Sequence, residues 1–367
     1  MSHATTRTGT RLKAFFKAPE WGLVAGLFMI LFVIYMLDSQ KAFFTWNTQK
    51  PLMMQVARLG LLAIGAAVVI IAGGIDLSVG AVVALSSVVV AKLITEWLPG
   101  AVISGSSVGP SAWVVGAAML ITVAIGLGVG LLHSVLINII RLPPFIATLA
   151  TMAGLRSLAS VLSNHKSINV SFTMFRHWGN DPWYTVPLFV SLAVMISIVM
   201  GRTVLGRHLY ALGGNEAAAR LSGLPVRRLK TFAYGLSGML AAVSGIMYTG
   251  QSGQGTSMLG ASYELYAITA AVVGGCSLAG GVGSIRGTVL GLILIQAVIK
   301  GTGLVAPKGI DSTQIEGLVL GSEPSVDWQF GNCAWATEKL KTKNNKTHAE
   351  PSLLTKIPLV DHNIVLR

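Results

Sequence analysis

Long apolar stretches run through most of this chain, and they constrain its fold more than any other feature. They lie near residues 21–37, 52–72, 79–98, 113–133, 145–163, 184–200, 231–250, 263–282 and 287–306. As helices, these stretches are long enough to cross the roughly 30 Å hydrocarbon core of a bilayer. Lipid offers the backbone no hydrogen-bond partners, so spanning segments of this length are helical. We predict an all-α polytopic membrane protein with about nine to ten transmembrane helices.

The composition excludes a water-soluble globule and a nucleic-acid binder. Only 11% of the 367 residues are charged and 53% are hydrophobic, whereas soluble domains carry about a quarter charged residues. The net charge of +13 is concentrated in the loops and the N-terminal arm, where membrane topology explains it without a nucleic-acid partner. Cys276 and Cys333 show no metal-ligand or disulfide spacing, so no metal site is expected.

The basic residues also assign the two sides of the membrane. The arm 1–20 is basic and no small-residue cleavage site follows the first span, which predicts a retained span and a cytoplasmic N-terminus. Counting spans from there places Arg141, the loop 201–230 and Arg286 in the cytoplasm. The same count places 38–50, 164–182 and 251–262 outside. The positive-inside rule agrees with this count.

Three regions follow from this organisation. They are a cytoplasmic basic arm (1–20), a transmembrane domain (21–321) that contains the cytoplasmic loop 201–230, and a polar tail (322–367). The segment 315–321 begins like a tenth span, but the polar residues after it stop the apolar pattern. We expect the tail to be poorly ordered, because its composition cannot bury enough apolar surface to offset the entropy of ordering.

A short capped helix is predicted within the cytoplasmic loop. Asn215 can cap its N-terminus, and Glu216 lies in the first turn, where the helix dipole favours an anion. Arg220 is spaced to pair with Glu216, and Gly223 and Pro225 end the helix. Such a short helix is marginal alone in water, so it gains order by packing on the membrane domain or on a partner. The loop is thus a candidate docking element; the alternative is an ordinary connection.

Small-residue breaks interrupt the apolar pattern. Gly-Gly pairs at 73–74, 274–275 and 280–281 and the Pro143-Pro144 pair fall where irregular backbone is tolerated only against protein or a wet cavity. A faint repeat relates 63–69 to 267–273, each closely followed by Gly-Gly. Weak internal symmetry of this kind is typical of two-halved transporters, although common membrane-helix residues also produce it by coincidence. The breaks indicate a transport path.

A few polar residues within the apolar regions are candidates for that path. Asp76 and Ser78 lie beside the first Gly-Gly pair; they either contact the permeating solute or cap a broken helix. Glu264 can meet a polar ligand or sit in an interfacial aromatic belt. Arg58 and Arg156 either snorkel or pair with one of the two acids.

Enzyme chemistry finds little support in the sequence. The segment 105–109 matches a nucleophile-elbow pattern, but it lies in a Gly/Ser loop without the strand and helix that the elbow needs. Segments 235–238 and 250–253 resemble GxSG motifs, which a glycine-rich chain produces by chance. The sequence contains no P-loop. No catalytic, cofactor-binding or metal-binding residue is predicted.

Several motifs together resemble the permease subunits of the ribose-type sugar ABC importers. They are GGIDLSVG at 73–80, PPFIATL at 143–149, GRHLYALGGNEAAARLSG at 206–223, Tyr263-Glu264-Leu265 with 268–275, and 280–287. These motifs occur in the family's order and span about residues 20–320; after Gly321 the sequence departs from the family. The resemblance implies the ABC importer permease fold in a bacterial cytoplasmic (inner) membrane.

The resemblance also implies partners and a coupling element. It implies a second permease copy (the same chain or a close homologue), an extracytoplasmic sugar-binding protein, and cytoplasmic ATPase subunits that bind ATP and Mg, with no cofactor on this chain and membrane lipid around it. The matching coupling residues are Gly213, Gly214, Asn215, Glu216, Ala217, Ala218, Ala219, Arg220 and Gly223. We therefore expect a permease that moves a monosaccharide such as ribose by alternating access. The alternative is an ion-coupled secondary transporter of a small polar solute.

Overall fold

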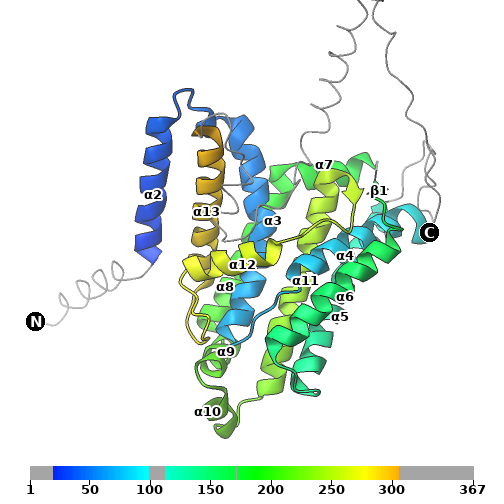
Figure 1. Ribbon diagram of the computed structural model, residues 1–367, viewed down its shortest axis with the longest axis vertical. Coiled ribbons are helices and arrows are strands. Elements are labelled where there is room, and N and C mark those ends of the chain that lie inside the picture. Colours follow the sequence, from blue (N-terminus) through cyan, green and yellow to red (C-terminus); the bar gives the residue numbers. More distant parts are fainter. Residues whose placement is uncertain (1–19, 99–111, 171, 306–367) are drawn as a thin grey trace, which may run out of the picture. The chain divides into compact units, whose positions relative to one another are not determined.

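The computed structural model describes residues 20–98, 112–170 and 172–305 (Figure 1). All of them belong to one compact unit, Met1–Ser325. The predictions for the arm, the segment 315–321 and the tail 322–367 fall outside the described residues, except that Glu20 begins the first helix. The elements are α2 (Glu20–Leu37), η1 (Ala42–Phe44), α3 (Trp46–Ile71), α4 (Val79–Lys92), η2 (Leu93–Trp97), α5 (Ala112–Asn138), α6 (Pro144–Leu162), β1 (Ile168–Asn169), α7 (Thr173–Asn180), α8 (Pro182–Arg202), α9 (Val204–Gly214), α10 (Glu216–Leu221), α11 (Val226–Ser252), β2 (Gln254–Gly255), α12 (Tyr263–Val273) and α13 (Ile285–Val305).

The prediction of an all-α polytopic membrane protein is confirmed. Within the described residues, seven helical segments are long and apolar enough to cross a bilayer, namely α3, α4 with η2, α5, α6, α8, α11 and α13. Two shorter apolar helices, Trp21–Leu37 and Tyr263–Val273, accompany them. The number of helices is therefore close to the expected nine to ten.

The apolar stretch 263–282 is not one spanning helix, and the helix ends at the predicted Gly274-Gly275 break. Helix α12 ends at Val273, and residues 274–284 run as a non-helical loop to the start of α13. The φ angle is +91° at Gly275 and +86° at Gly280, a backbone region that residues with a Cβ rarely adopt and that ends a helix. A similar break follows α3, where Gly73 has φ +81° before α4 begins at Val79.

Three helices form the centre of the bundle. The apolar windows of α3, α4 and α11 are 89%, 83% and 78% buried, whereas those of α6 and α8 are only 22% buried and face outward. Glycines allow α5 and α11 to touch: a methyl group on Gly130 would overlap the carbonyl oxygen of Tyr234, and one on Gly126 would lie 2.5 Å from the carbonyl oxygen of Gly238. Close approach through small residues is the usual way that helices associate in lipid.

Loops that were predicted to lie on opposite sides of the membrane lie at opposite ends of the bundle. Strands β1 and β2 form an antiparallel pair, Ile168 with Gly255 and Asn169 with Gln254, and both strands come from loops predicted to lie outside. Figure 1 shows α9 and α10 at the opposite end from β1. The helices α7 and α9 were not predicted.

Candidate functional site

Helix α10 has the local structure that its sequence predicts. The Oδ1 of Asn215 accepts a hydrogen bond from Ala218 N at 2.9 Å, which caps the helix. Arg220 donates to Glu216 at 3.0 Å across one turn. Gly223 has φ +78° directly after the helix, as a helix-ending glycine does. The sequence reading missed one contact: Lys230 of α11 donates to the second oxygen of Glu216 at 2.8 Å.

The Glu216 carboxylate thus ties α10 to the start of α11. Partial burial favours the neutral acid, but hydrogen bonds and charges from Lys230 and Arg220 outweigh it and hold the pKa of Glu216 below its usual value. The side chain remains 42% exposed, so water screens much of each ion pair. The pairs orient α10 more than they stabilise the fold.

Helix α10 presents an apolar surface away from the bundle. Ala217 and Ala218 are exposed, and the Leu221 side chain is 90% exposed. Ala219 is buried. Of the three alanines in the predicted docking helix, it is therefore the one that faces the protein and not the solvent. An exposed leucine beside two alanines, outside the helices that are long enough to span a membrane, forms a small patch suited to a protein partner. Leu221 was not among the predicted residues.

Helix α9 connects α10 to the two broken regions of the bundle. Gly213 packs against the loop after α3 and the loop after α12: a Cβ on Gly213 would overlap Ile71 O and lie 2.6 Å from Gly281 N. Gly281 N in turn donates to Ile71 O at 3.0 Å. We call Gly73, Gly213, Gly280 and Gly281 the glycine junction.

A tyrosine side chain reinforces this junction, and the two sequence repeats end close to it. The hydroxyl of Tyr210 donates to Gly283 O at 2.9 Å, which ties α9 to the loop before α13. The repeats 63–69 and 267–273 lie near the ends of α3 and α12, and the Gly-Gly turns that follow lead into the loops that meet at the junction. Gly213 therefore packs against both of the corresponding breaks.

Asp76 and Ser78 organise the loop between α3 and α4. Asp76 Oδ1 accepts hydrogen bonds from Ser78 N at 3.0 Å and Ser78 Oγ at 2.7 Å, and Oδ2 accepts one from Ser237 Oγ at 2.8 Å. Both residues are buried, with 3% of Asp76 exposed. Asp76 thus satisfies an amide just before α4, as the capping interpretation expects, and it also links this loop to α11.

Glu264 lies in the first turn of α12. Its Oε2 atom is buried and has no hydrogen-bond partner within the described part of the chain. It is close enough to α4 that a methyl group on Gly80 would overlap it. An unpartnered buried carboxylate oxygen is costly, so Glu264 differs from Asp76, whose two oxygens both accept hydrogen bonds.

The two intramembrane arginines do not pair with these acids in the part of the chain that the structure describes. Arg58 is buried with its guanidinium 4.6 Å from the ring centroid of Tyr248, and its Nε and Nη1 have no hydrogen-bond partner. Arg156 donates to Gly260 O at 3.3 Å, in the turn before α12. Of the two alternatives left open by the sequence, ion pairing with Asp76 or Glu264 is not found among the described residues.

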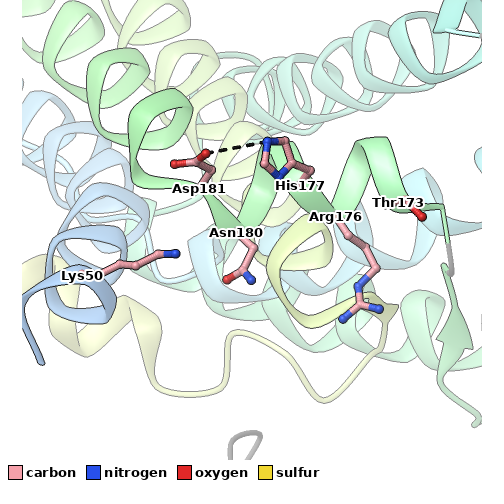
Figure 2. A pocket seen from close by; sticks show the side chains of 6 residues that line it. All are labelled: Lys50, Thr173, Arg176, His177, Asn180 and Asp181. Carbon is pink, nitrogen blue, oxygen red and sulfur yellow. Dashed lines mark ion pairs between the residues drawn. The ribbon is translucent and has the colours of Figure 1, made fainter. Parts of the chain in front are cut away.

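A polar pocket of about 300 Å³ opens near the end of the bundle that carries the strands (Figure 2). Its lining comes from α3, α7 and the residue before α8: Lys50, Thr173, Arg176, His177, Asn180 and Asp181. His177 Nε2 lies 3.8 Å from Asp181 Oδ2, while Asp181 Oδ1 accepts from Trp183 N and caps α8. The amphipathic helical pattern of α7, which buries Phe175 and Gly179, could have indicated this helix from the sequence.

Comparison with known proteins places this geometry in context. Residues 50–321 match the sequence family described as "Branched-chain amino acid transport system / permease component". The ribose import permease protein RbsC of Bacillus subtilis is 36% identical over 82% of this chain and 89% of its own length. The fructose import permease protein FruG of Bifidobacterium longum is 31% identical over 79% and 87%. The L-arabinose transport system permease protein AraH of Escherichia coli is 30% identical over 82% and 88%. No solved structure matches the chain.

Proposed function

Because the chain belongs to the branched-chain amino acid transport system / permease component family, among the ribose-type ABC permeases, we propose that it moves a monosaccharide across the membrane by alternating access. The relatives named above are import proteins for ribose, fructose and arabinose, which favours a pentose or a hexose as the solute. They also favour an ATP-driven importer over an ion-coupled transporter.

The structure of α10 is the observation that supports a coupling role. Its fold is held by the Asn215 cap and the Glu216 ion pairs, while Ala218 and Leu221 are left exposed outside the spans. A small rigid helix with an apolar tip fits a groove on a partner and can transmit the partner's movement. The glycine junction gives that movement a direct route to the loops after α3 and α12.

The partner subunits supply the parts that this chain does not provide. A cytoplasmic ATPase binds ATP and Mg and docks on α10, and this chain binds no cofactor. A sugar-binding protein docks at the opposite end, where β1, β2 and the pocket of Figure 2 lie. A second permease copy completes the path, and the N-terminus faces the cytoplasm.

The path candidates divide into two roles. Asp76 and Ser78 hold the shape of the loop beside the path, because the Asp76 carboxylate accepts hydrogen bonds from Ser78 and from Ser237 of α11. Glu264 meets the sugar, because its unpartnered Oε2 can accept a hydrogen bond from a hydroxyl group as the solute passes. A carboxylate that accepts hydrogen bonds from hydroxyl groups favours a neutral sugar as the solute. It would repel the carboxylate group of an amino acid.

The docking role is tested by adding bulk to α10. Ala218→Trp places an indole on the exposed face, and Glu216→Lys removes both ion pairs and puts a cation at the helix N-terminus. We expect both variants to insert normally and to lose most labelled-sugar uptake and most retention of the ATPase in pull-downs. Ala112→Trp, which adds the same bulk to an exposed alanine at the start of α5, is the control and should transport normally.

The results separate the two interpretations of the loop. Normal uptake by both α10 variants would reduce the loop to a connection and remove the coupling proposal. Lost uptake with full ATPase retention would keep the loop functional but would place its contact elsewhere.

A further inference from the structure

A second pocket, of about 480 Å³, lies beside α10 and is strongly basic. Its charged lining comes from the loop after α5, from α10 and from the start of α11: Arg141, Glu216, Arg220, Arg227 and Lys230. These segments are far apart in sequence and meet at the end of the bundle that carries α10 (Figure 1). We propose that this pocket binds a phosphate-bearing anion.

The charge balance of the pocket favours an anion. Glu216 is the only acid among the described residues that line it, and both oxygens of that carboxylate are already engaged by Arg220 and Lys230. Arg141 and Arg227 form no ion pair with any acid of the described residues. Two guanidinium groups beside one cavity therefore remain uncompensated, and their planar forks match phosphate oxygens in pairs.

The backbone holds these cations in place. Arg141 has φ +64°, a left-handed conformation that is costly for a residue with a long side chain and that tends to persist at functional sites. The amide of Asn138 donates to Arg227 O at 3.3 Å, which fixes the start of α11 against the end of α5. Helix α6 begins at Pro144 on the pocket wall, so its positive dipole end adds to the field.

The size and position of the pocket define the class of ligand. A volume of about 480 Å³ exceeds what one phosphate group needs and leaves room for an attached glycerol or sugar. A neutral sugar would gain little from several cations, whereas a phosphate monoester or diester would neutralise them. The ligand is either the headgroup of an anionic phospholipid or a soluble phosphorylated compound, and the phosphate is common to both.

The test uses the full-length chain and removes the uncompensated charges. The double variant Arg141→Gln/Arg227→Gln loses two pocket cations, and the control Arg228→Gln/Arg286→Gln loses the same charge from exposed residues outside the pocket. One arm counts retained phosphatidylglycerol by native mass spectrometry after detergent extraction. The other arm titrates inorganic phosphate by calorimetry.

We expect at least about tenfold weaker binding in the pocket variant and unchanged binding in the control. A loss confined to the phosphatidylglycerol arm identifies a lipid headgroup, and a loss confined to the phosphate arm identifies a soluble ligand. The variant Arg141→Lys/Arg227→Lys keeps the charge but not the fork geometry; intermediate binding by this variant separates ligand contact from misfolding.

Two outcomes would overturn the proposal. Equal binding of both probes by the pocket variant and the control would mean that these cations serve membrane topology alone. Normal binding of both probes together with lost ATPase retention would assign the cations to an acidic patch on that partner. Neither outcome depends on transport activity, so the anion site and the coupling role of α10 fail separately.

Discussion

The glycine junction predicts that two neighbouring glycines respond to the same substitution in opposite ways. Gly213 and Gly214 are the last two residues of α9. A methyl group on Gly213 would overlap Ile71 O and crowd Gly281 N, whereas one on Gly214 would meet nothing within 4 Å. Gly213→Ala and Gly214→Ala therefore form a matched pair. The change in helix propensity is nearly the same in both variants, and only the contact with other segments differs.

The magnitude follows from three contributions. Replacing glycine by alanine in a helix gains up to about 1 kcal/mol, and less at a helix end. Forcing a methyl group into a packed site costs about 1–3 kcal/mol. Separating the loops breaks the 3.0 Å hydrogen bond from Gly281 N to Ile71 O, and leaving its buried partners unsatisfied costs about 1–3 kcal/mol more. We expect Gly213→Ala to destabilise by about 1–5 kcal/mol and Gly214→Ala to be neutral or slightly stabilising.

The assay is thermal unfolding of the detergent-purified chain, followed by uptake in membranes. Gly213→Ala should lower the apparent melting temperature by several degrees, and Gly214→Ala should leave it unchanged or raise it. Uptake should fall in the first variant only, because the overlap separates α9 from the loops that it contacts. Equal melting temperatures for the two variants would show that the junction accommodates a methyl group at Gly213 without loss of stability. The reasoning from close backbone contact would then be wrong.

Three further predictions concern single side chains. Asp76→Ala should destabilise the chain by about 2–4 kcal/mol, because it removes an acceptor of three buried hydrogen bonds; Asp76→Asn should cost less, since the amide keeps an acceptor. Unfolding in detergent measures both, and a larger loss for the Asn variant would mean that the charge itself is required. The pKa of Glu216 is lowered by its cationic partners. The small contribution of these ion pairs to the stability of α10 is therefore complete above pH 4.5, the usual pKa of a glutamate, and is lost as the pH falls through the lowered pKa. Amide exchange of α10, corrected for intrinsic rates, should rise over that interval, and a constant protection factor would contradict the pairing. For topology, an impermeant thiol reagent should label Lys166→Cys in intact cells and Ser222→Cys only after permeabilisation; the reverse result would invert the assigned sides.

Some features could be predicted from the sequence because their causes lie within a few residues. The apolar spans follow from length and composition, since lipid accepts only segments that satisfy their own backbone. The cap at Asn215 and the pair of Glu216 with Arg220 follow from spacing along one helix turn. The glycine breaks at 73–74 and 274–275 were visible as well, because glycine has no Cβ and adopts positive φ angles without strain, as Gly73 and Gly275 do.

The tertiary structure alone decided how these pieces meet. Nothing local indicates that Lys230 reaches Glu216, that Gly213 seats between the loops after α3 and α12, or that Arg141 and Arg227 share a pocket. The stretch 263–282 was counted as a span because hydropathy is averaged over a window, although the Gly-Gly pair at 274–275 ends α12 at Val273. Contacts between distant segments depend on how helix faces pack, and packing is set by the shapes of all the neighbours together rather than by any one stretch of sequence.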